Sequence, residues 1–283
     1  MFIYTADVHL TDKQPINRIT PVFPTCVQKL DEILSLAEKH KACLILGGDL
    51  FENPCPSYEL YNAVINVFDK HDVITYTVFG NHDVLYGDTQ SQNNALQALI
   101  LSGKVRVLSE IPTKIDGFDV FGVSYRKELY KDFSFLDIKD PSNTIVVTHQ
   151  FMSDKKLPFN HVNVSDFNTN VHLVLCSHLH DPFDCTNDTG TRFINPGCVC
   201  RINRNEEYID PKCILVNEND IQELSLGFPK AAFNSSEIKK TAFVKSISDA
   251  KVEVQDITMY INNSTASDDV KKAAIALIKE YQQ

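Results

Sequence analysis

Short apolar runs and amphipathic stretches alternate along the first part of the chain. Apolar runs of strand length occur at residues 2–6, 42–47, 73–79, 119–123, 144–149 and 171–176. Their nearly continuous Ile, Val and Leu character is typical of strands buried on both faces. Residues 25–40 and 57–71 separate the first three runs and carry apolar side chains at helical spacing. This alternation predicts βαβ units and a mostly parallel sheet.

The pattern changes twice further along the chain. After about residue 105 helical stretches become rare, so we expect the second half to be richer in strands. Near residue 227 the stretch GFPKAAFNSSE reads as a linker. Beyond it, 251–261 alternates as a strand does, and Ser267 begins a helix with one apolar face. We therefore predict a main domain over 1–226 and a small β-α accessory or capping module over 227–283.

Charge and cysteine content limit the classes of function. The formal net charge is −10, and the acidic excess lies in residues 1–226, because 227–283 is close to neutral. Nucleic-acid binders usually show a basic face, so we expect a partner or bound metal to supply positive charge, or a small substrate. The eight cysteines form no CxxC pair and no secretory signal precedes them, which favours reduced thiols in the cytoplasm. No apolar run approaches ~18 residues, so no membrane span is expected.

Polar side chains follow five of the predicted strands, at the point where each strand ends. In chain order they are Asp7 and His9, then Asp49, then Asn81, His82 and Asp83, then His149, and last His178 and His180. The carboxyl ends of parallel strands lie at one edge of a sheet, which is where ligands bind in open α/β sheets. Taken alone, Asp7 with His9 would fit a turn, Asp49 a helix cap and His149 a buried core histidine. All five together predict a site.

The residue types at these strand ends indicate a metal site. Asp, Asn and His side chains without cysteine suit divalent ions such as Mn²⁺, Fe²⁺ or Zn²⁺, and Mg²⁺ is a further candidate. Seven ligand-type residues are more than one ion needs, whereas two ions ~3.5–4 Å apart that share one carboxylate would use them all. Such a pair binds a phosphate and generates hydroxide from water. The sequence therefore predicts a two-metal phosphoesterase, with Mn²⁺ as the favoured ion.

The motifs DVH, GDLF, GNHD, TH and HLH, in this order over residues 5 to about 200, resemble those of the calcineurin-like metallophosphoesterases. The resemblance implies an α/β (α+β) fold in which helices flank a two-sheet β-sandwich. It also implies that the first metal is held by Asp7, His9, Asp49 and His180, and the second by Asp49, Asn81, His149 and His178. His82 would then be the general acid for the leaving oxygen, and Asp83 would orient it.

Two segments resemble the SbcD/Mre11 nuclease branch of this superfamily, GDLFENPCPS and NPGCVCRINRNEE. This resemblance implies an exonuclease or endonuclease for DNA repair, recombination or replication. DNA would be its substrate and an SbcC/Rad50-like ATPase its partner, with a homodimer possible. Three residues depart from the pattern of this branch. One is Glu52, which stands where many nuclease relatives have His or Asp, so exonuclease activity and metal preference could differ from theirs. Ser177 and Cys198 are the other two.

Two other functions fit the same motifs. A phosphoesterase for small or cyclic nucleotides needs no basic face, and so it agrees with the acidic composition. A non-catalytic scaffold of the same fold would only bind partners. The complete set of ligand-type residues, together with His82, argues against the scaffold.

Overall fold

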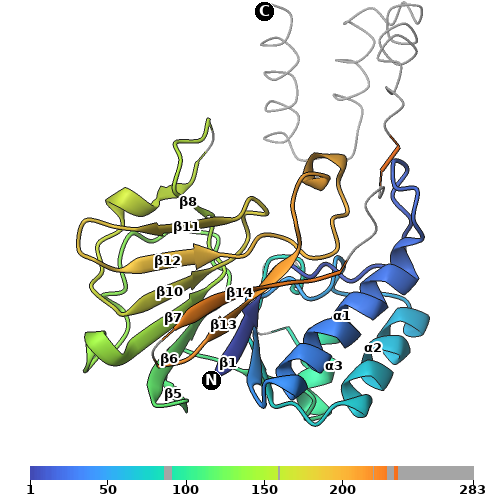
Figure 1. Cartoon of the computed structure of the whole chain (residues 1–283), viewed down its shortest axis with the longest axis horizontal. Helices are drawn as coiled ribbons and strands as arrows, with labels where there is room; N and C mark the ends of the chain where they lie inside the picture. The colour runs from blue at the N-terminus through green and yellow to red at the C-terminus, as the bar shows by residue number, and fades with distance from the viewer. Residues whose placement is uncertain (86–90, 159, 219, 228–232, 235–283) are drawn as a thin grey trace, which may run out of the picture. The chain divides into compact units, whose positions relative to one another are not determined.

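Two six-stranded sheets face each other in a β-sandwich, and helices flank one of them (Figure 1). The computed structural model describes residues 1–85, 91–158, 160–218, 220–227 and 233–234. The predicted fold class, a two-sheet sandwich flanked by helices, is confirmed. None of the helices in these ranges combines the length and the apolar character needed to cross a bilayer.

The first sheet has the strand order β14-β13-β1-β2-β3-β4. Its strands are β1 (Phe2–Thr5), β2 (Cys43–Leu46), β3 (Thr75–Thr77), β4 (Arg106–Val107), β13 (Lys212–Val216) and β14 (Ile221–Ser225). Strands β1 to β4 are parallel to one another, whereas β13 runs antiparallel to both β1 and β14. The first strand of the chain therefore lies inside the sheet, between β2 and a strand from near residue 214.

The second sheet has the strand order β11-β12-β10-β7-β6-β5. Its strands are β5 (Thr113–Ile115), β6 (Phe118–Val123), β7 (Thr144–Thr148), β10 (Leu173–Cys176), β11 (Phe183–Thr186) and β12 (Arg192–Asn195). The four central strands are parallel, and the edge strands β5 and β11 are antiparallel to their neighbours. A separate two-stranded ribbon pairs β8 (Met152–Ser153) with β9 (Val162–Asn163).

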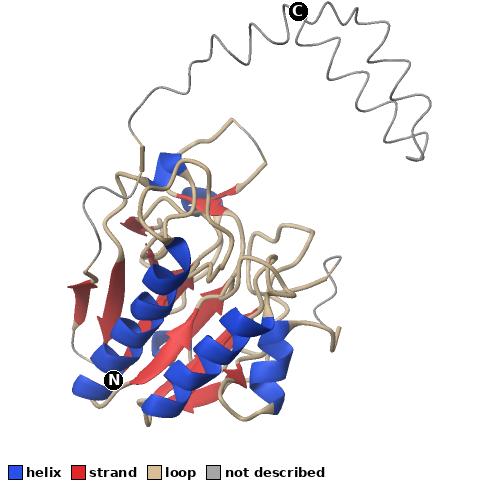
Figure 2. Ribbon diagram, turned by 90° about the vertical axis from the view of Figure 1, so that its right-hand side faces the viewer, coloured by secondary structure: helices blue, strands red, loops and turns tan. Residues whose placement is uncertain are grey.

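Three α-helices pack on the outer face of the first sheet (Figure 2). They are α1 (Val22–Lys39), α2 (Tyr58–Lys70) and α3 (Ala95–Leu101). Side-chain oxygens fix the starts of the last two, because Ser57 accepts from the Leu60 N–H and Asn94 accepts from the Gln97 N–H. Short 3₁₀ turns occur at Pro141–Asn143, Val164–Asp166 and Arg204–Glu206.

The alternation of side chains along β1 shows how the core is layered. Phe2 and Tyr4 point into the space between the two sheets, and Ile3 points the other way, toward the helices. All three are fully buried, and each such side chain contributes about 1.5–3 kcal/mol relative to an exposed one. The Tyr4 hydroxyl also donates a 2.7 Å hydrogen bond to the Cys176 carbonyl of β10, which ties the two sheets together.

The predicted elements agree with the observed ones at most positions. The helices predicted over 25–40 and 57–71 are α1 and α2, and each predicted strand from the first 226 residues contains an observed one, although β3 is shorter than predicted. The second half is rich in strands, as expected. Helix α3 and the strands β4, β5, β8, β9 and β11 to β14 were not predicted.

The C-terminal part of the chain is described only as far as Asn234. Residues Met1–Asn234 form one compact unit. Phe233 is buried and bridges to Arg18, and the Gly227 N–H donates to Glu32 on α1. The predicted strand over 251–261 and the helix after Ser267 lie outside the described residues, so the division at residue 226 stays a prediction. All eight cysteines are free thiols.

Candidate metal centre

Sharp backbone turns end several of the strands that lead to the predicted site. Asp7, His9, Asp49 and His178 all have left-handed backbone conformations, with φ of 49°, 52°, 49° and 74°. Residues other than glycine adopt this region rarely, although Asp and His do so more readily than most. Each such residue costs of the order of 1–3 kcal/mol, and this strain is characteristic of functional sites. The turns direct four ligand-type side chains into one space.

The first cluster contains Asp7, His9 and His180, whose ligand atoms lie within 4.8 Å of one another. The Nδ1–H of His9 donates to Glu52 and that of His180 donates to Glu206, both at 2.7 Å. The two Nε2 atoms face each other at 2.9 Å. When both rings are neutral, two lone pairs therefore point at the same space, an arrangement that a cation between them would satisfy. Carboxylate–histidine pairs of this kind orient metal ligands in proteins.

The second cluster is centred on the Nε2 atom of His149. This atom lies 3.0 Å from Asn81 Oδ1, 3.2 Å from His178 Nδ1 and 3.3 Å from Asp49 Oδ2. Its own Nδ1–H donates to the Gly47 carbonyl at 2.8 Å, which leaves Nε2 as an acceptor. When the His149 ring is neutral, amide, imidazole and carboxylate acceptors thus converge on one space, which again fits a bound cation.

Asp49 lies between the two clusters. Its Oδ2 atom is 3.3 Å from His149 Nε2 and 3.8 Å from His9 Nε2. Glycine is required at position 80, because a Cβ there would lie 2.0 Å from Asp49 Oδ1. The donor set therefore fits two divalent cations that share the Asp49 carboxylate. The structure brings together all seven side chains predicted as ligands, namely Asp7, His9, Asp49, Asn81, His149, His178 and His180.

The electrostatics of the clusters also show that the site attracts positive charge. Burial alone would lower the pKa of His9, but its hydrogen bond to Glu52 and the charges of Asp49 and Asp7 raise that pKa to about 9. Burial would also lower the pKa of His149, but the charges of Asp49 and Asp7 outweigh burial and raise that pKa to about 9. Without metal, protons on these rings balance the buried carboxylates. Cations that bind here must displace those protons.

His82 differs from the ligand-type residues in exposure and in its contacts. Its side chain is 39% exposed, whereas those of His9 and His149 are almost fully buried. Its Nδ1–H donates to the Glu52 backbone carbonyl at 2.9 Å, and its backbone N–H donates to Asp49 Oδ1 at 2.7 Å. It also lies close enough to His9 and Asp49 to join a metal cluster. An exposed ring beside a buried cation pair is well placed to meet a substrate.

Asp83, expected to orient His82, faces the backbone instead. One carboxylate oxygen accepts from the Gly80 N–H at 2.9 Å and the other from the Phe51 N–H at 3.3 Å. These bonds join the loop after β2 to the loop after β3. Burial, with a contribution from the charge of Asp49, raises the pKa of Asp83 to about 6. The ring of His82 is oriented by the Glu52 carbonyl, because the Asp83 carboxylate is turned toward these two backbone groups.

Two carboxylates in the site were not identified from the sequence. Glu52 was noted only as a departure, yet it contacts the rings of both His9 and His82. Glu206 is 2% exposed and accepts from His180, and Asn203 donates to it from both its backbone and its side chain. The only signal for Glu206 was its place in the NPGCVCRINRNEE segment.

A family model described as calcineurin-like phosphoesterase matches residues 1–182. The chain belongs to the calcineurin-like phosphoesterase family. Membership indicates a metal-dependent phosphoester hydrolase, and the two clusters described above provide the histidine and aspartate ligands that such an enzyme needs. The sequence-based assignment to this superfamily is therefore confirmed.

Solved structures with a similar fold come from distant relatives. A dimetal phosphatase from Danio rerio is 12% identical, with a TM-score of 0.50, and the match covers 82% of this chain and 99% of that one. A protein from Thermus thermophilus, TT1561, is 14% identical with a TM-score of 0.48 and coverage of 79% and 97%. A 5′-nucleotidase from Candida albicans is 12% identical with a TM-score of 0.44 and coverage of 88% and 57%. No curated protein matches the sequence. Of these three, only the Danio rerio protein reaches a TM-score of 0.50, and at 12% identity that likeness bears on the fold alone.

Proposed function

We propose that the protein is a two-metal-dependent phosphodiesterase that cleaves DNA, as a nuclease of the SbcD/Mre11 type. The observation that carries the proposal is the convergence of seven ligand-type side chains beside a half-exposed histidine, His82. A scaffold that had lost its chemistry would have no need to keep the costly left-handed turns at Asp7, His9, Asp49 and His178.

Some residues of the site would bind the metal ions, and His82 would transfer a proton. A pair of divalent ions, Mn²⁺ in the first place, lowers the pKa of water and stabilises charge on a phosphate when bound. Asp49 would hold both ions in place from between the clusters. The Nδ1–H of His82 is committed to the Glu52 carbonyl, so the proton that can move is the one on Nε2. His82 would donate that proton to the leaving oxygen, a contribution of roughly 10²–10⁴ in rate.

Aromatic side chains around the second cluster favour a substrate that carries a base. The half-buried rings of Phe151 and Tyr125 lie 5.0 Å and 5.9 Å from the ring of His178, measured between centroids. Rings in such positions can stack on nucleobases. The motifs that resemble those of the SbcD/Mre11 branch favour DNA as the substrate that carries these bases. Because the chain is acidic, an SbcC/Rad50-like ATPase that grips the DNA would be its partner.

A substrate panel tests the proposal. Protein loaded with Mn²⁺ is incubated with linear duplex DNA, single-stranded DNA, cyclic nucleotides and bis-p-nitrophenyl phosphate. We expect cleavage of DNA and of the synthetic diester, lost in His82→Ala and kept in His40→Ala, a control outside the site. Hydrolysis of cyclic nucleotides without DNA cleavage would establish the small-nucleotide alternative. Full metal binding without hydrolysis of any substrate would establish a scaffold.

A further inference from the structure

A groove opens beside the metal centre, where β4, an edge strand of the first sheet, approaches β6 of the second sheet. It encloses about 410 Å³, within the range of pockets that hold small ligands. Its lining comes from the segment that follows β3, from β4 with the loop after it, and from β6 with the residues after it. We call it the edge groove and define it by Phe79, Leu108, Ile111, Ser124, Tyr125 and Arg126.

The floor of the edge groove is rigid and apolar. Phe79 and Leu108 are buried. The Tyr125 N–H donates to the Phe79 carbonyl at 2.8 Å, and the Phe79 N–H donates to the Ser124 hydroxyl at 3.0 Å. A Cβ at Gly122 would lie 2.4 Å from that of Leu108, so the two segments are as close as their backbones allow. A ligand would meet a preformed surface, which reduces the cost of ordering it.

The edge groove lies next to the second cluster. The ring of Tyr125, which lines the groove, lies 5.9 Å from the ring of His178 and 6.4 Å from that of His149. Phe79 on the floor is followed by Gly80 and then by the ligand-type Asn81. A molecule whose phosphate lies at the metal centre can therefore place its adjoining group in the groove.

The positively charged side chain of Arg126 lies at the rim of the edge groove. The Arg126 guanidinium lies 4.3 Å from the ring centroid of Phe135 and 5.7 Å from that of Tyr130, and Glu110 pairs with it. Its side chain is 36% exposed, so its charge remains open to a further anion. The stack on Phe135 fixes the direction of the guanidinium. Apolar floor, aromatic wall and cation together suit a nucleobase followed by a phosphate.

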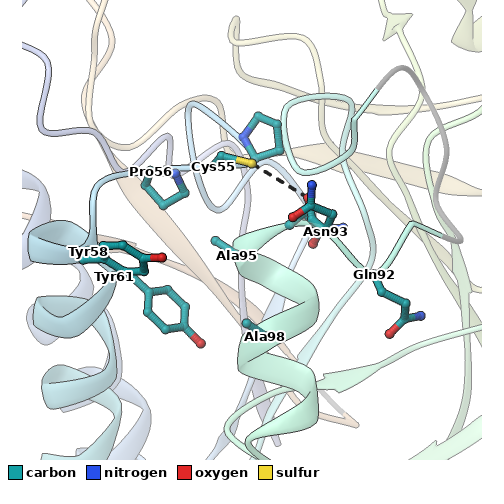
Figure 3. A pocket seen from close by; sticks show the side chains of 10 residues that line it. Cys55, Pro56, Tyr58, Tyr61, Gln92, Asn93, Ala95 and Ala98 are labelled. Atoms are coloured by element: carbon teal, nitrogen blue, oxygen red, sulfur yellow. Dashed lines mark hydrogen bonds between the residues drawn. The ribbon is translucent and has the colours of Figure 1, made fainter.

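A second pocket has the same volume as the edge groove, about 410 Å³, but a different lining (Figure 3). Its lining comes from the loop before α2, from α2 and from the start of α3, and includes Cys55, Tyr58 and Tyr61. It has aromatic rings, but it lacks an arginine among its lining residues. Only the edge groove, of these two, has a ring packed against the metal-ligand histidines.

We propose that the edge groove is the nucleoside subsite of the enzyme. The base next to the scissile phosphate stacks on Tyr125, and Arg126 contacts the next phosphate along the strand. This inference rests on the proposed phosphodiesterase function and names the part of the substrate that is recognised. It makes Tyr125 a specificity-determining residue.

The first test compares two substrates that differ only in the nucleoside. The p-nitrophenyl ester of thymidine 5′-phosphate and methyl p-nitrophenyl phosphate share a leaving group and a scissile bond. With Mn²⁺-loaded protein, Tyr125→Ala should lower kcat/KM for the thymidine ester by roughly 5- to 150-fold, the usual range for a lost base stack. The methyl ester should change by less than about threefold. Tyr125→Phe should retain the wild-type preference, and Tyr58→Ala, a tyrosine of the other pocket, should alter neither rate.

The second test measures binding without turnover. Titration calorimetry of the Mn²⁺-loaded protein should show that deoxyadenosine 5′-monophosphate binds more tightly than inorganic phosphate. Tyr125→Ala should abolish that difference, and Arg126→Gln should weaken thymidine 3′,5′-bisphosphate more than the monophosphate. Equal losses for both esters in Tyr125→Ala, or none, would overturn the subsite while leaving the phosphodiesterase intact. Failure of the wild-type protein to hydrolyse either ester would overturn the proposed function, and nucleotide binding would still decide the subsite.

Discussion

Replacing Glu206 by glutamine isolates the contribution of a carboxylate that supports the metal centre without facing a substrate. Glu206 accepts three hydrogen bonds, one from His180 Nδ1 at 2.7 Å and two from Asn203 at 2.8 and 2.9 Å. Glutamine has the same shape but only one acceptor oxygen. If that oxygen serves His180, the amide NH₂ must face the Asn203 backbone N–H, so a donor meets a donor. The substitution also removes the charge that makes His180 a stronger ligand.

The size of the effect follows from two independent considerations. A hydrogen bond to a charged group contributes about 1.5–3 kcal/mol. Loss of a carboxylate that supports a metal-ligand histidine costs about 10–100-fold in metal affinity, which is roughly 1.4–2.8 kcal/mol. Despite burial, the hydrogen bond and charge of His180 lower the pKa of Glu206. The Glu206 carboxylate is therefore charged at any pH above the ordinary glutamate pKa of about 4.3. Its contribution to metal affinity is lost only as the pH falls below that value.

Chelator competition with Mn²⁺ at pH 7 measures the affinities of both sites. We expect the ion bound by His180 to weaken by about 10–100-fold in Glu206→Gln, and the ion bound by His149 to change by less than about threefold. Glu207→Gln, an exposed neighbour, is the matched control and should behave as wild type. Unchanged affinity at both sites would refute the reasoning. So would equal weakening of both sites together with a large fall in Tm, because that result would mark Glu206 as a purely structural residue.

We expect four further outcomes, three at the metal centre and one for the C-terminal part of the chain. His82→Ala should keep two metals per chain and lower the single-turnover rate by roughly 10²–10⁴-fold, and metal analysis that shows an emptied site would contradict this. Asp49→Ala should lose both metals, because its carboxylate lies between the clusters; one retained ion would argue against a shared ligand. Metal affinity should rise as pH increases toward 9, since His9 and His149, with pKa values of about 9, must release protons; a flat profile of Kd from pH 6.5 to 9 would exclude this. A chain ending at residue 234 should keep its Tm and its hydrolysis of small diesters but lose activity on duplex DNA, whereas unfolding on truncation would make the tail part of the core.

Sequence order alone was sufficient to locate the ligand-type residues. Asp7, Asp49 and His149 each follow a buried parallel strand, and parallel strands place their carboxyl ends at a common edge. The prediction needed only the direction of each strand and the residue at its end. Strand β13, by contrast, was missed because KCILV is a short apolar run with no helix beside it. Its pairing with β1 joins parts of the chain more than 200 residues apart, which no local pattern reveals.

The partners of the ligand-type residues could not be predicted in the same way. Glu52 lies in a loop and Glu206 ends the short 3₁₀ turn Arg204–Glu206, and the hydrogen bonds of both depend on how two distant segments approach in space. The resemblance assigned the orientation of His82 to Asp83, the residue that follows it. The chain turn at these residues directs the Asp83 carboxylate to the Gly80 and Phe51 amides instead.

The central position of β1 in the first sheet has a consequence for biosynthesis. β1 is made first, but its neighbour on one side, β13, follows only at Lys212–Val216. Until those residues leave the ribosome, β1 has an open edge, and such edges invite pairing with other chains. Contacts between such distant segments also slow folding. The nascent chain therefore carries Asp7 and His9 long before the sheet beside them is closed, and the set of ligand-type side chains that begins with them is complete only once His180 has been synthesised.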